Sequence, residues 1–473
     1  MVSDAKLKTS EDELVKKITL RLIPFMMILY VVSYLDRINI SFAALQMNQD
    51  LKISDEAFGF GAGIFFFGYC LFGIPSNLVI QKFGPRRWIS AIMILWGFVT
   101  IGMCFVRNEL DFKILRFVLG IAEAGFFPGM ILYLTYWFPP KYYGGAVARF
   151  MAAIPIAGLL GSGVAAFALN LKLGGLAGWM WLFILTGLPA ILLGIAVRFW
   201  LPDRPRNATW LTADESREVE RMVGAKEVPT HESDDSANVS ARSAATSDSA
   251  TSNSATTTPD SASTKNSGDT TGGESSGFFT TLKDFYVWRF ALLYFTLTVS
   301  MYGFQLWLPQ IIKAFGSLDD TATALISAIP ALFQALGMLI IAGHSDKTGE
   351  RRYHVVLATA CTFVGLGISC FGPYPWLKLV GLCLAAFGIW GSVGPFWALT
   401  TNSLKRSSHV TGIAVINSVG NLGGFAGPYI VGVIKEYSHG FNDSLIALAV
   451  ASVLAGIIAS TSPKTPQERV SKS

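Results

Sequence analysis

The chain has 473 residues, of which 52% are hydrophobic and only 15% are charged. A soluble domain usually carries about 25% charged residues, so this composition excludes a soluble globular protein and indicates one embedded in a lipid bilayer. The net charge of +5 does not indicate nucleic-acid binding, because the basic residues gather in particular loops between apolar segments.

Apolar segments long enough to cross a bilayer, which takes about 20 residues, recur along the whole chain. We count twelve, at approximately 20–47, 57–81, 87–106, 110–138, 143–171, 178–200, 287–314, 322–343, 352–371, 376–403, 408–435 and 441–461. Six lie on each side of a long polar segment. The sequence therefore predicts an all-α polytopic membrane protein with twelve transmembrane helices in two six-helix bundles, 1–200 and 287–473 including a C-terminal tail.

The polar segment between the two halves, 201–286, is predicted to be a cytoplasmic linker. It begins with a turn and a short surface helix, in which Thr212 and Glu215 have capping-box spacing. Residues 229–276 consist mainly of Ser, Thr, Ala, Asn, Asp and Gly. Such a composition cannot bury enough apolar surface to offset chain entropy, so we expect this part to be disordered.

The basic residues in short loops predict the orientation. Alternate loops carry Lys82, Arg86 and Arg87; Lys141 and Arg149; Lys347, Arg351 and Arg352; and Lys405 and Arg406. By the positive-inside rule these loops face the cytoplasm, and both termini do so too. Residues 1–19 show no cleavable signal pattern, and we expect a multi-pass protein of a bacterial inner (plasma) membrane.

The first predicted span contains two adjacent charges, Asp36 and Arg37. A charge near the middle of a membrane helix costs about 2.5–3.5 kcal/mol on insertion scales, and such residues usually serve a function. Neighbouring residues on a helix point about 100° apart, so the two charges cannot simply neutralise each other. Each needs its own partner on another helix or in a water-filled cavity.

The fourth span places two more ionisable residues at depth, Arg116 and Glu123. They are seven residues apart, hence on one face and about 10.5 Å apart along the axis, whereas the middles of the last six spans are uncharged. The four groups sum to zero charge, and an entering carboxylate makes the site negative until an acid takes up a proton. This predicts proton coupling at Asp36 and Glu123 and anion binding at Arg37 and Arg116. The alternative is a salt-bridge network that only locks the helices together, with Arg116 snorkelling to the interface.

The opposite wall of such a site is expected to be polar but uncharged. Tyr34 and Tyr69 are candidates to hydrogen-bond substrate oxygens in the first half. Candidates in the second half are Gln305, Trp397, Thr400, Asn402, Asn417 and Asn421. The alternative is that these residues only pack or hydrogen-bond between helices. Small-residue runs such as GFGAG (59–63) and GNLGGFAGP (420–428) are expected to allow close helix approach.

An internal repeat supports the two-half organisation. QKFGPRR (81–87), between the second and third spans, matches DKTGERR (346–352), between the eighth and ninth. Recurrence at the same place in two six-helix halves is typical of a two-bundle transporter.

These two motifs resemble the loop motif of the major facilitator superfamily, although Gln81, Asn77 and Ala342 depart from it. Five further segments resemble the anion:cation symporter branch of this superfamily: YLDRINISFAALQMNQDL, IFFFGYCLFGIPSNL, RFVLGIAEAGFFPGM, LPDRPRNATWL and YGFQLWLPQIIKAFG. Members of that branch import organic carboxylates such as tartrate, phthalate and sugar acids with protons. The resemblance implies that the helix 1 arginine holds the carboxylate and that the acids of helices 1 and 4 couple protons. It also implies a cytoplasmic gating motif at Gly84, Arg86, Arg87, Asp346, Gly349 and Arg351.

The sequence thus predicts a monomeric secondary active transporter, a proton-coupled symporter of a small organic anion that works by alternating access. The alternative within transport is an organic-anion exchanger or exporter. A transporter-like sensor is disfavoured because the linker shows no folded signalling domain. No cofactor is expected, and a membrane enzyme is disfavoured because no intramembrane His pair, GxSxG or metal-ligand spacing is present.

Overall fold

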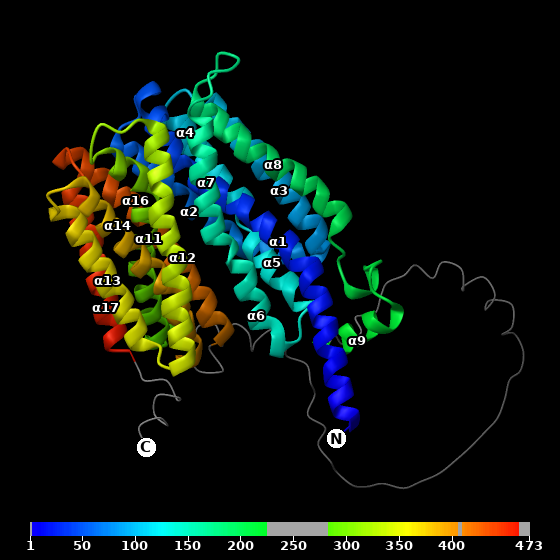
Figure 1. The fold of residues 1–473 in the computed structure, drawn as a ribbon. Helices are drawn as coiled ribbons and strands as arrows, with labels where there is room; N and C mark the ends of the chain where they lie inside the picture. Colours follow the sequence, from blue (N-terminus) through cyan, green and yellow to red (C-terminus); the bar gives the residue numbers. More distant parts are fainter. Residues whose placement is uncertain (1, 225–281, 405–408, 463–473) are drawn as a thin grey trace, which may run out of the picture.

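The computed structural model describes residues 2–224, 282–404 and 409–462, and this part of the chain is entirely helical (Figure 1). The first half contains α1 (Val2–Asp50), α2 (Asp55–Phe83), α3 (Pro85–Gly102), η1 (Met103–Phe105), α4 (Glu109–Glu123), α5 (Phe126–Thr135), α6 (Pro140–Met151), α7 (Ala153–Ala168), α8 (Gly178–Trp200), η2 (Pro205–Asn207) and α9 (Ala213–Val223). The second half contains α11 (Phe285–Lys313), α12 (Asp320–Thr348), α13 (Arg352–Phe371), α14 (Pro375–Gly391), α15 (Val393–Ser403), α16 (His409–Ser438) and α17 (Asn442–Ser460).

Within the described residues, eleven helical segments are long and apolar enough to cross a membrane. They correspond to eleven of the twelve predicted spans. The remaining span is α16, which is 30 residues long but less apolar, because it carries several glycines and two asparagines. It packs against α2, α11 and α17, and it is therefore the twelfth membrane helix.

Three predicted spans are interrupted, which the apolar pattern did not indicate. The breaks fall at Ala124–Gly125 between α4 and α5, at Ala152 between α6 and α7, and at Ser392 between α14 and α15. A proline, at 128, 155 or 395, follows each break by three or four residues. A proline removes a helical hydrogen bond and clashes with the carbonyl four residues earlier. Other prolines lie in helices that stay continuous, so local packing also contributes.

Helix α1 extends well before the predicted span and contacts α9. Lys17 of α1 forms an ion pair with Glu215 of α9 at 2.7 Å, and Glu11 lies 3.3 Å from Arg221. The capping box predicted for Thr212 and Glu215 is present, with each side chain bonded to the other's backbone N–H. The short surface helix is therefore confirmed, whereas the predicted disordered part of the linker, 229–276, lies outside the described residues.

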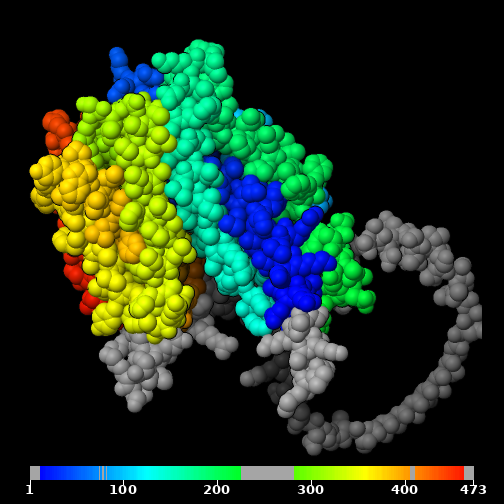
Figure 2. Space-filling view, viewed as in Figure 1, coloured from blue at the N-terminus to red at the C-terminus, as the bar shows by residue number. Residues whose placement is uncertain are grey.

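The two halves form two bundles that meet at one end and separate at the other (Figures 1 and 2). We call the end with the loops 51–54, 171–177, 314–319 and 439–441 the closed end. The open end carries both termini and α9. The bundles contact each other mainly through α2 on α16 and α7 on α12.

Ion pairs, hydrogen bonds and close backbone packing hold the closed end together. Lys435 of α16 lies 2.6 Å from Asp55 of α2, and Glu436 accepts a hydrogen bond from the Asp55 backbone N–H at 2.8 Å. A Cβ added to Gly59 would lie 2.5 Å from the Pro428 carbonyl oxygen, and one on Gly432 equally close to the Asp55 carbonyl. The predicted close helix approach at these small-residue runs is thus confirmed.

Candidate functional site

A buried ion pair joins α1 to α4 of the first bundle. The Nη2 atom of Arg37 lies 2.6 Å from Oε1 of Glu123, and the Ser33 hydroxyl donates to the same oxygen at 2.9 Å. Glu123 is 1% exposed and is the last residue of α4 before the interruption. The expectation that Arg37 needs a partner on another helix is confirmed.

Aromatic rings from both bundles surround the Arg37 guanidinium. Its central carbon lies 5.4 Å from the ring centroid of Phe65 and 5.2 Å from that of Tyr69, both on α2. Tyr302 of α11 lies near Arg37, and its ring centroid lies 4.1 Å from that of Phe66. Arg37 is thus positioned where the two bundles meet.

Asp36 lies on a different side of α1. Its two carboxylate oxygens accept hydrogen bonds from the Thr100 hydroxyl of α3 at 2.6 Å and from the Asn39 amide at 3.0 Å. Asn39 also donates to Thr186 of α8 at 2.9 Å. Asp36 is fully buried and has no ion pair with any described residue. The two buried acids, which the sequence grouped in one constellation, therefore have separate environments.

Arg116 is buried beside the ion pair rather than directed to the membrane surface. It is 1% exposed, donates to the Ala62 carbonyl at 3.3 Å, and lies 4.9 Å from the Phe65 centroid. The alternative that Arg116 snorkels is wrong, because its side chain is buried against α2 and does not reach the membrane surface. Among the described residues, Arg116 has no carboxylate at ion-pair distance.

Tyr34 extends the site towards the second bundle. It is 2% exposed, and its ring packs edge-on against Trp390 of α14 with centroids 6.1 Å apart. Its side chain lies near Tyr302 and Arg37. The structure therefore brings Tyr34, Arg37 and Tyr69 together with Glu123 and Arg116.

The predicted residues of the second bundle are further from this cluster. Trp397 packs against Tyr294 at 5.0 Å between centroids, and Tyr294 in turn lies within electrostatic range of Arg37. Thr400 is fully buried, whereas Asn402 and Asn417 are exposed and Asn421 is half-buried. Gln305 accepts a hydrogen bond from Gln334 at 2.7 Å. No hydrogen bond between described residues connects any of these to Arg37.

Sequence reasoning missed several residues of the cluster. Ser33 precedes Arg37 by four positions, and this helical spacing could have identified it. Thr100, Tyr302 and Trp390 carried no such signal, because a Thr, Tyr or Trp in an apolar span usually only packs. Only the packing of the helices shows that they adjoin charged groups.

The two loop motifs lie at the open end, each within its own bundle. Gly84 has φ +82° and joins α2 to α3, and the Arg86 side chain donates to the Arg198 carbonyl at 2.7 Å. In the second motif Gly349 has φ +69° and Arg351 lies 2.5 Å from Asp346. Arg87 is exposed. Positive φ at the two glycines explains why both turns use this residue.

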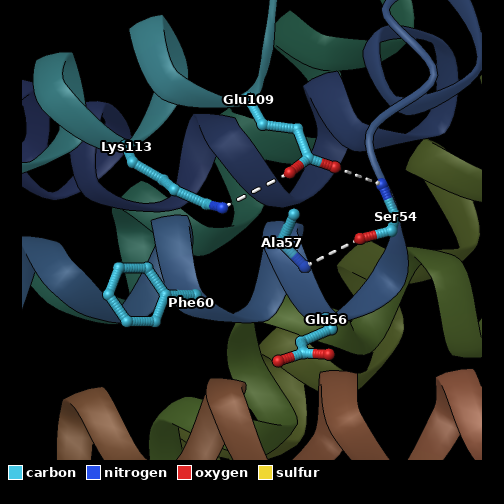
Figure 3. A pocket seen from close by; sticks show the side chains of 6 residues that line it. All are labelled: Ser54, Glu56, Ala57, Phe60, Glu109 and Lys113. Atoms are coloured by element: carbon cyan, nitrogen blue, oxygen red, sulfur yellow. Dashed lines mark hydrogen bonds and ion pairs between the residues drawn. The ribbon is translucent and has the colours of Figure 1, made fainter.

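A pocket of about 410 Å³ lies at the closed end and is separate from this cluster (Figure 3). Its lining residues are Ser54, Glu56, Ala57, Phe60, Glu109 and Lys113. The Lys113 and Glu109 side chains lie 3.3 Å apart within α4, so the only cation among the described residues that line this pocket already has a carboxylate partner. In the described ranges no group of three His, Cys, Asp or Glu side chains could hold a metal ion.

Comparison with known proteins agrees with this architecture. Residues 26–428 match the Major Facilitator Superfamily. A putative tartrate transporter of Agrobacterium vitis is 40% identical, over 98% of this chain and 97% of its own length. A quinolone resistance transporter of Acinetobacter baumannii is 35% identical, over 95% and 94% respectively.

The fold is also found among solved structures. A bacterial homologue of the human lysosomal transporter Spinster, in an inward-facing and unoccupied conformation, superposes with a TM-score of 0.69. It is 16% identical, and the match covers 95% of this chain and 97% of that one. With its twelve-helix fold, its buried charges and these relatives, the chain belongs to the Major Facilitator Superfamily and is a membrane transporter.

Proposed function

We propose that the protein imports a small organic carboxylate together with protons by alternating access. The observation that carries this proposal is the Arg37–Glu123 ion pair of 2.6 Å, buried where the bundles meet. The relative named as a putative tartrate transporter, which matches nearly the whole chain, supports a carboxylate as the substrate class.

The ion pair supplies a mechanism for coupling. Arg37 is the cation best placed to bind a substrate carboxylate, since a guanidinium matches a carboxylate with paired donors. In the described structure the Glu123 carboxylate already forms an ion pair with Arg37. A substrate carboxylate and an ionised Glu123 therefore compete for Arg37, and protonation of Glu123 ends the competition. Proton and substrate then bind together and leave together.

Asp36 has a different place in the proposed mechanism. Thr100 and Asn39 hold its carboxylate, so it does not compete directly with substrate for Arg37. It is a second proton site, and its charge contributes to the neutral sum of the four ionisable groups. Substrate binding at Arg37 adds negative charge nearby, which favours a proton on Asp36 as well.

The available driving force suffices for uptake. Each pH unit contributes about 1.4 kcal/mol per proton, and each net charge moved contributes about 2.3 kcal/mol per 100 mV. One proton with a monoanion uses only the pH gradient, whereas additional protons also draw on the membrane potential. In the proposed orientation the open end faces the cytoplasm, so the described conformation is the one that releases substrate.

Uptake into liposomes containing the purified protein tests the proposal. We expect at least one of L-tartrate, nicotinate, benzoate or succinate to enter faster when the exterior is acidic, and a protonophore to abolish accumulation. Arg37→Lys keeps the charge but loses the paired donors, and we expect it to weaken carboxylate binding at least about tenfold. Binding of neutral compounds but of no carboxylate would reject the proposal.

Exchange or export is the second candidate, because a relative named as a quinolone resistance transporter matches 95% of this chain. The two candidates differ in their dependence on protons. The exchanger would be supported if counterflow is rapid without a pH gradient and if an imposed pH gradient never leads to substrate accumulation. Accumulation driven by an acidic exterior would reject it.

A further inference from the structure

Two neighbouring aromatic side chains at the boundary between the bundles each carry a buried polar group without a hydrogen-bond partner. Tyr34 of α1 and Trp390 of α14 are 2% and 4% exposed, and their rings meet edge-on at 6.1 Å. Neither the Tyr34 hydroxyl nor the Trp390 indole N–H has a partner among the described residues. Buried polar groups are nearly always hydrogen-bonded, so such a pair requires an explanation.

An unpartnered indole is not by itself evidence of a ligand. The N–H groups of Trp96 and Trp137 are also buried without a described partner, and both lie in the core of the first bundle. What distinguishes Trp390 is its position opposite a second unpartnered donor on the other bundle. Two such donors at one place indicate an acceptor that enters from outside the protein.

The position of Trp390 in the fold supports the same conclusion. Trp390 is the penultimate residue of α14, directly before the interruption at Ser392. Glu123 is the last residue of α4, directly before the interruption at Ala124. The interrupted spans α4–α5 and α14–α15 are each the fourth span of their bundle. Glu123 and Trp390 therefore occupy corresponding places in the repeat. Transporters commonly use interrupted helices at the bundle interface to present polar groups to a substrate.

Tyr34 connects this place to the charged group. It precedes Arg37 by three residues on α1, so the two side chains share a helix face. The Tyr34 side chain also lies near Tyr302 and Arg37. A short ligand held by Arg37 therefore reaches Tyr34 and Trp390 without leaving the bundle interface.

We propose that Tyr34 and Trp390 form a second, uncharged subsite, which binds a hydrogen-bond acceptor on a carboxylate held by Arg37. This inference rests on the proposed function. An indole N–H only donates, and a phenolic hydroxyl can donate, so the subsite takes a hydroxyl or carbonyl oxygen or a ring nitrogen. The substrate class is thereby narrowed to short carboxylates with a second acceptor. Because Tyr34 and Trp390 belong to different bundles, such a ligand bridges them.

Paired probes that differ only in the acceptor test this inference in the reconstituted full-length protein. Nicotinate and benzoate differ by a ring nitrogen, and L-tartrate and succinate differ by two hydroxyls. In the wild type we expect the acceptor-bearing member of the transported pair to bind about tenfold more tightly. Trp390→Phe and Tyr34→Phe should each abolish most of this preference for the acceptor-bearing member. Trp137→Phe, which removes an unpartnered indole that packs against Trp210 of the linker, should preserve it.

The outcomes separate this inference from the proposed function. An unchanged ratio in both variants, with carboxylate uptake intact, overturns the subsite and leaves the proposed function standing. Absence of any carboxylate binding, or binding that is insensitive to Arg37→Lys, overturns the proposed function instead. Tyr34→Phe removes a single oxygen atom, so the inference stays testable even if Trp390→Phe does not insert into the membrane.

Discussion

Glu123 and Asp36 are both fully buried carboxylic acids, yet their surroundings suit them to different tasks. Glu123 lies in an ion pair with Arg37, whereas Asp36 accepts hydrogen bonds from neutral groups only. Removing the charge of Glu123 therefore frees a buried arginine, whereas removing that of Asp36 leaves Arg37 unaffected. In the proposed mechanism Glu123 is the acid that exchanges places with the substrate.

Glu123→Gln tests this role directly. Glutamine cannot carry the exchangeable proton, so we expect the accumulation that a one-unit pH gradient drives to fall about tenfold, which is the contribution of one proton. Exchange of labelled for unlabelled substrate should continue, because Arg37 stays available. Glu109→Gln is the matched control, since Glu109 pairs with Lys113 at the closed end. Wild-type accumulation by Glu123→Gln would contradict the assignment.

At the scale of helices, α2 and α16 form the closed end, and their contact must break when the transporter opens on that side. The contact combines the Lys435–Asp55 ion pair with backbone packing at Gly59 and Gly432. The packing requires glycine, because any larger residue would meet a carbonyl oxygen. The ion pair adds attraction between two partly exposed side chains, and its loss should shift the conformational equilibrium without preventing closure.

Lys435→Met should favour the state that is open at the closed end by about two- to fivefold, the effect of one partly exposed ion pair. Phe58 is buried against Trp307 across the bundle boundary, with ring centroids 4.9 Å apart. A cysteine at residue 58 therefore reports the opened state through its rate of labelling by an impermeant maleimide. Lys113→Met is the control, because its ion pair lies within α4. Equal labelling in both variants would show that the pair does not hold the bundles together.

Helix α9 is attached to α1 by an ion pair whose strength depends on pH. The hydrogen bond from Lys17, and then the backbone of Thr212, lower the pKa of Glu215 below its usual range. A group with a lowered pKa in the folded state stabilises that state above its unfolded pKa, about 4.3 for glutamate. This stabilisation is lost as the pH falls through the lowered value.

We therefore expect α9 to stay docked from neutral pH down to about pH 5 and to undock below about pH 4. Spin labels at residues 13 and 213 measure the distance between the two helices. Glu215→Gln should weaken the docking of α9 about two- to fivefold at every pH, the effect of one exposed ion pair, because Glu11 still pairs with Arg221. Glutamine still completes the capping box. Asp214→Asn, whose partner Arg217 lies within α9, should behave as the wild type. A distance that is independent of pH would contradict this attachment.

For the whole molecule, alternating access requires that the two bundles rock about the interface that carries the site. The described conformation has one closed and one open end (Figure 1), with Arg37 between them. The positive-inside rule predicts that the open end is cytoplasmic. This orientation makes the ion pairs of the closed end an external gate.

Single cysteines in a variant without the five native ones test the orientation. A cysteine at residue 213 on α9 should react with an impermeant maleimide only after the membrane is permeabilised. One at Leu173, which is 58% exposed in a loop of the closed end, should react in intact cells. The reverse pattern would invert the topology, and with it the direction of transport.

The sequence by itself determined the number and approximate limits of the membrane helices, because the bilayer imposes a length and an apolar composition on each span. It also identified all four buried charges, since an ionisable residue in an apolar span is conspicuous. The interruptions were missed because an apolar pattern does not show where a proline will break a helix.

Only the tertiary structure decided how the charges are paired. Adjacent residues such as Asp36 and Arg37 face different helices, so their partners depend on which helices pack against α1 and at what height. The same holds for Tyr34 and Trp390, which lie more than 350 residues apart in the sequence yet meet across the bundle boundary. Composition reveals that a group is costly to bury, but long-range packing determines what it is buried against.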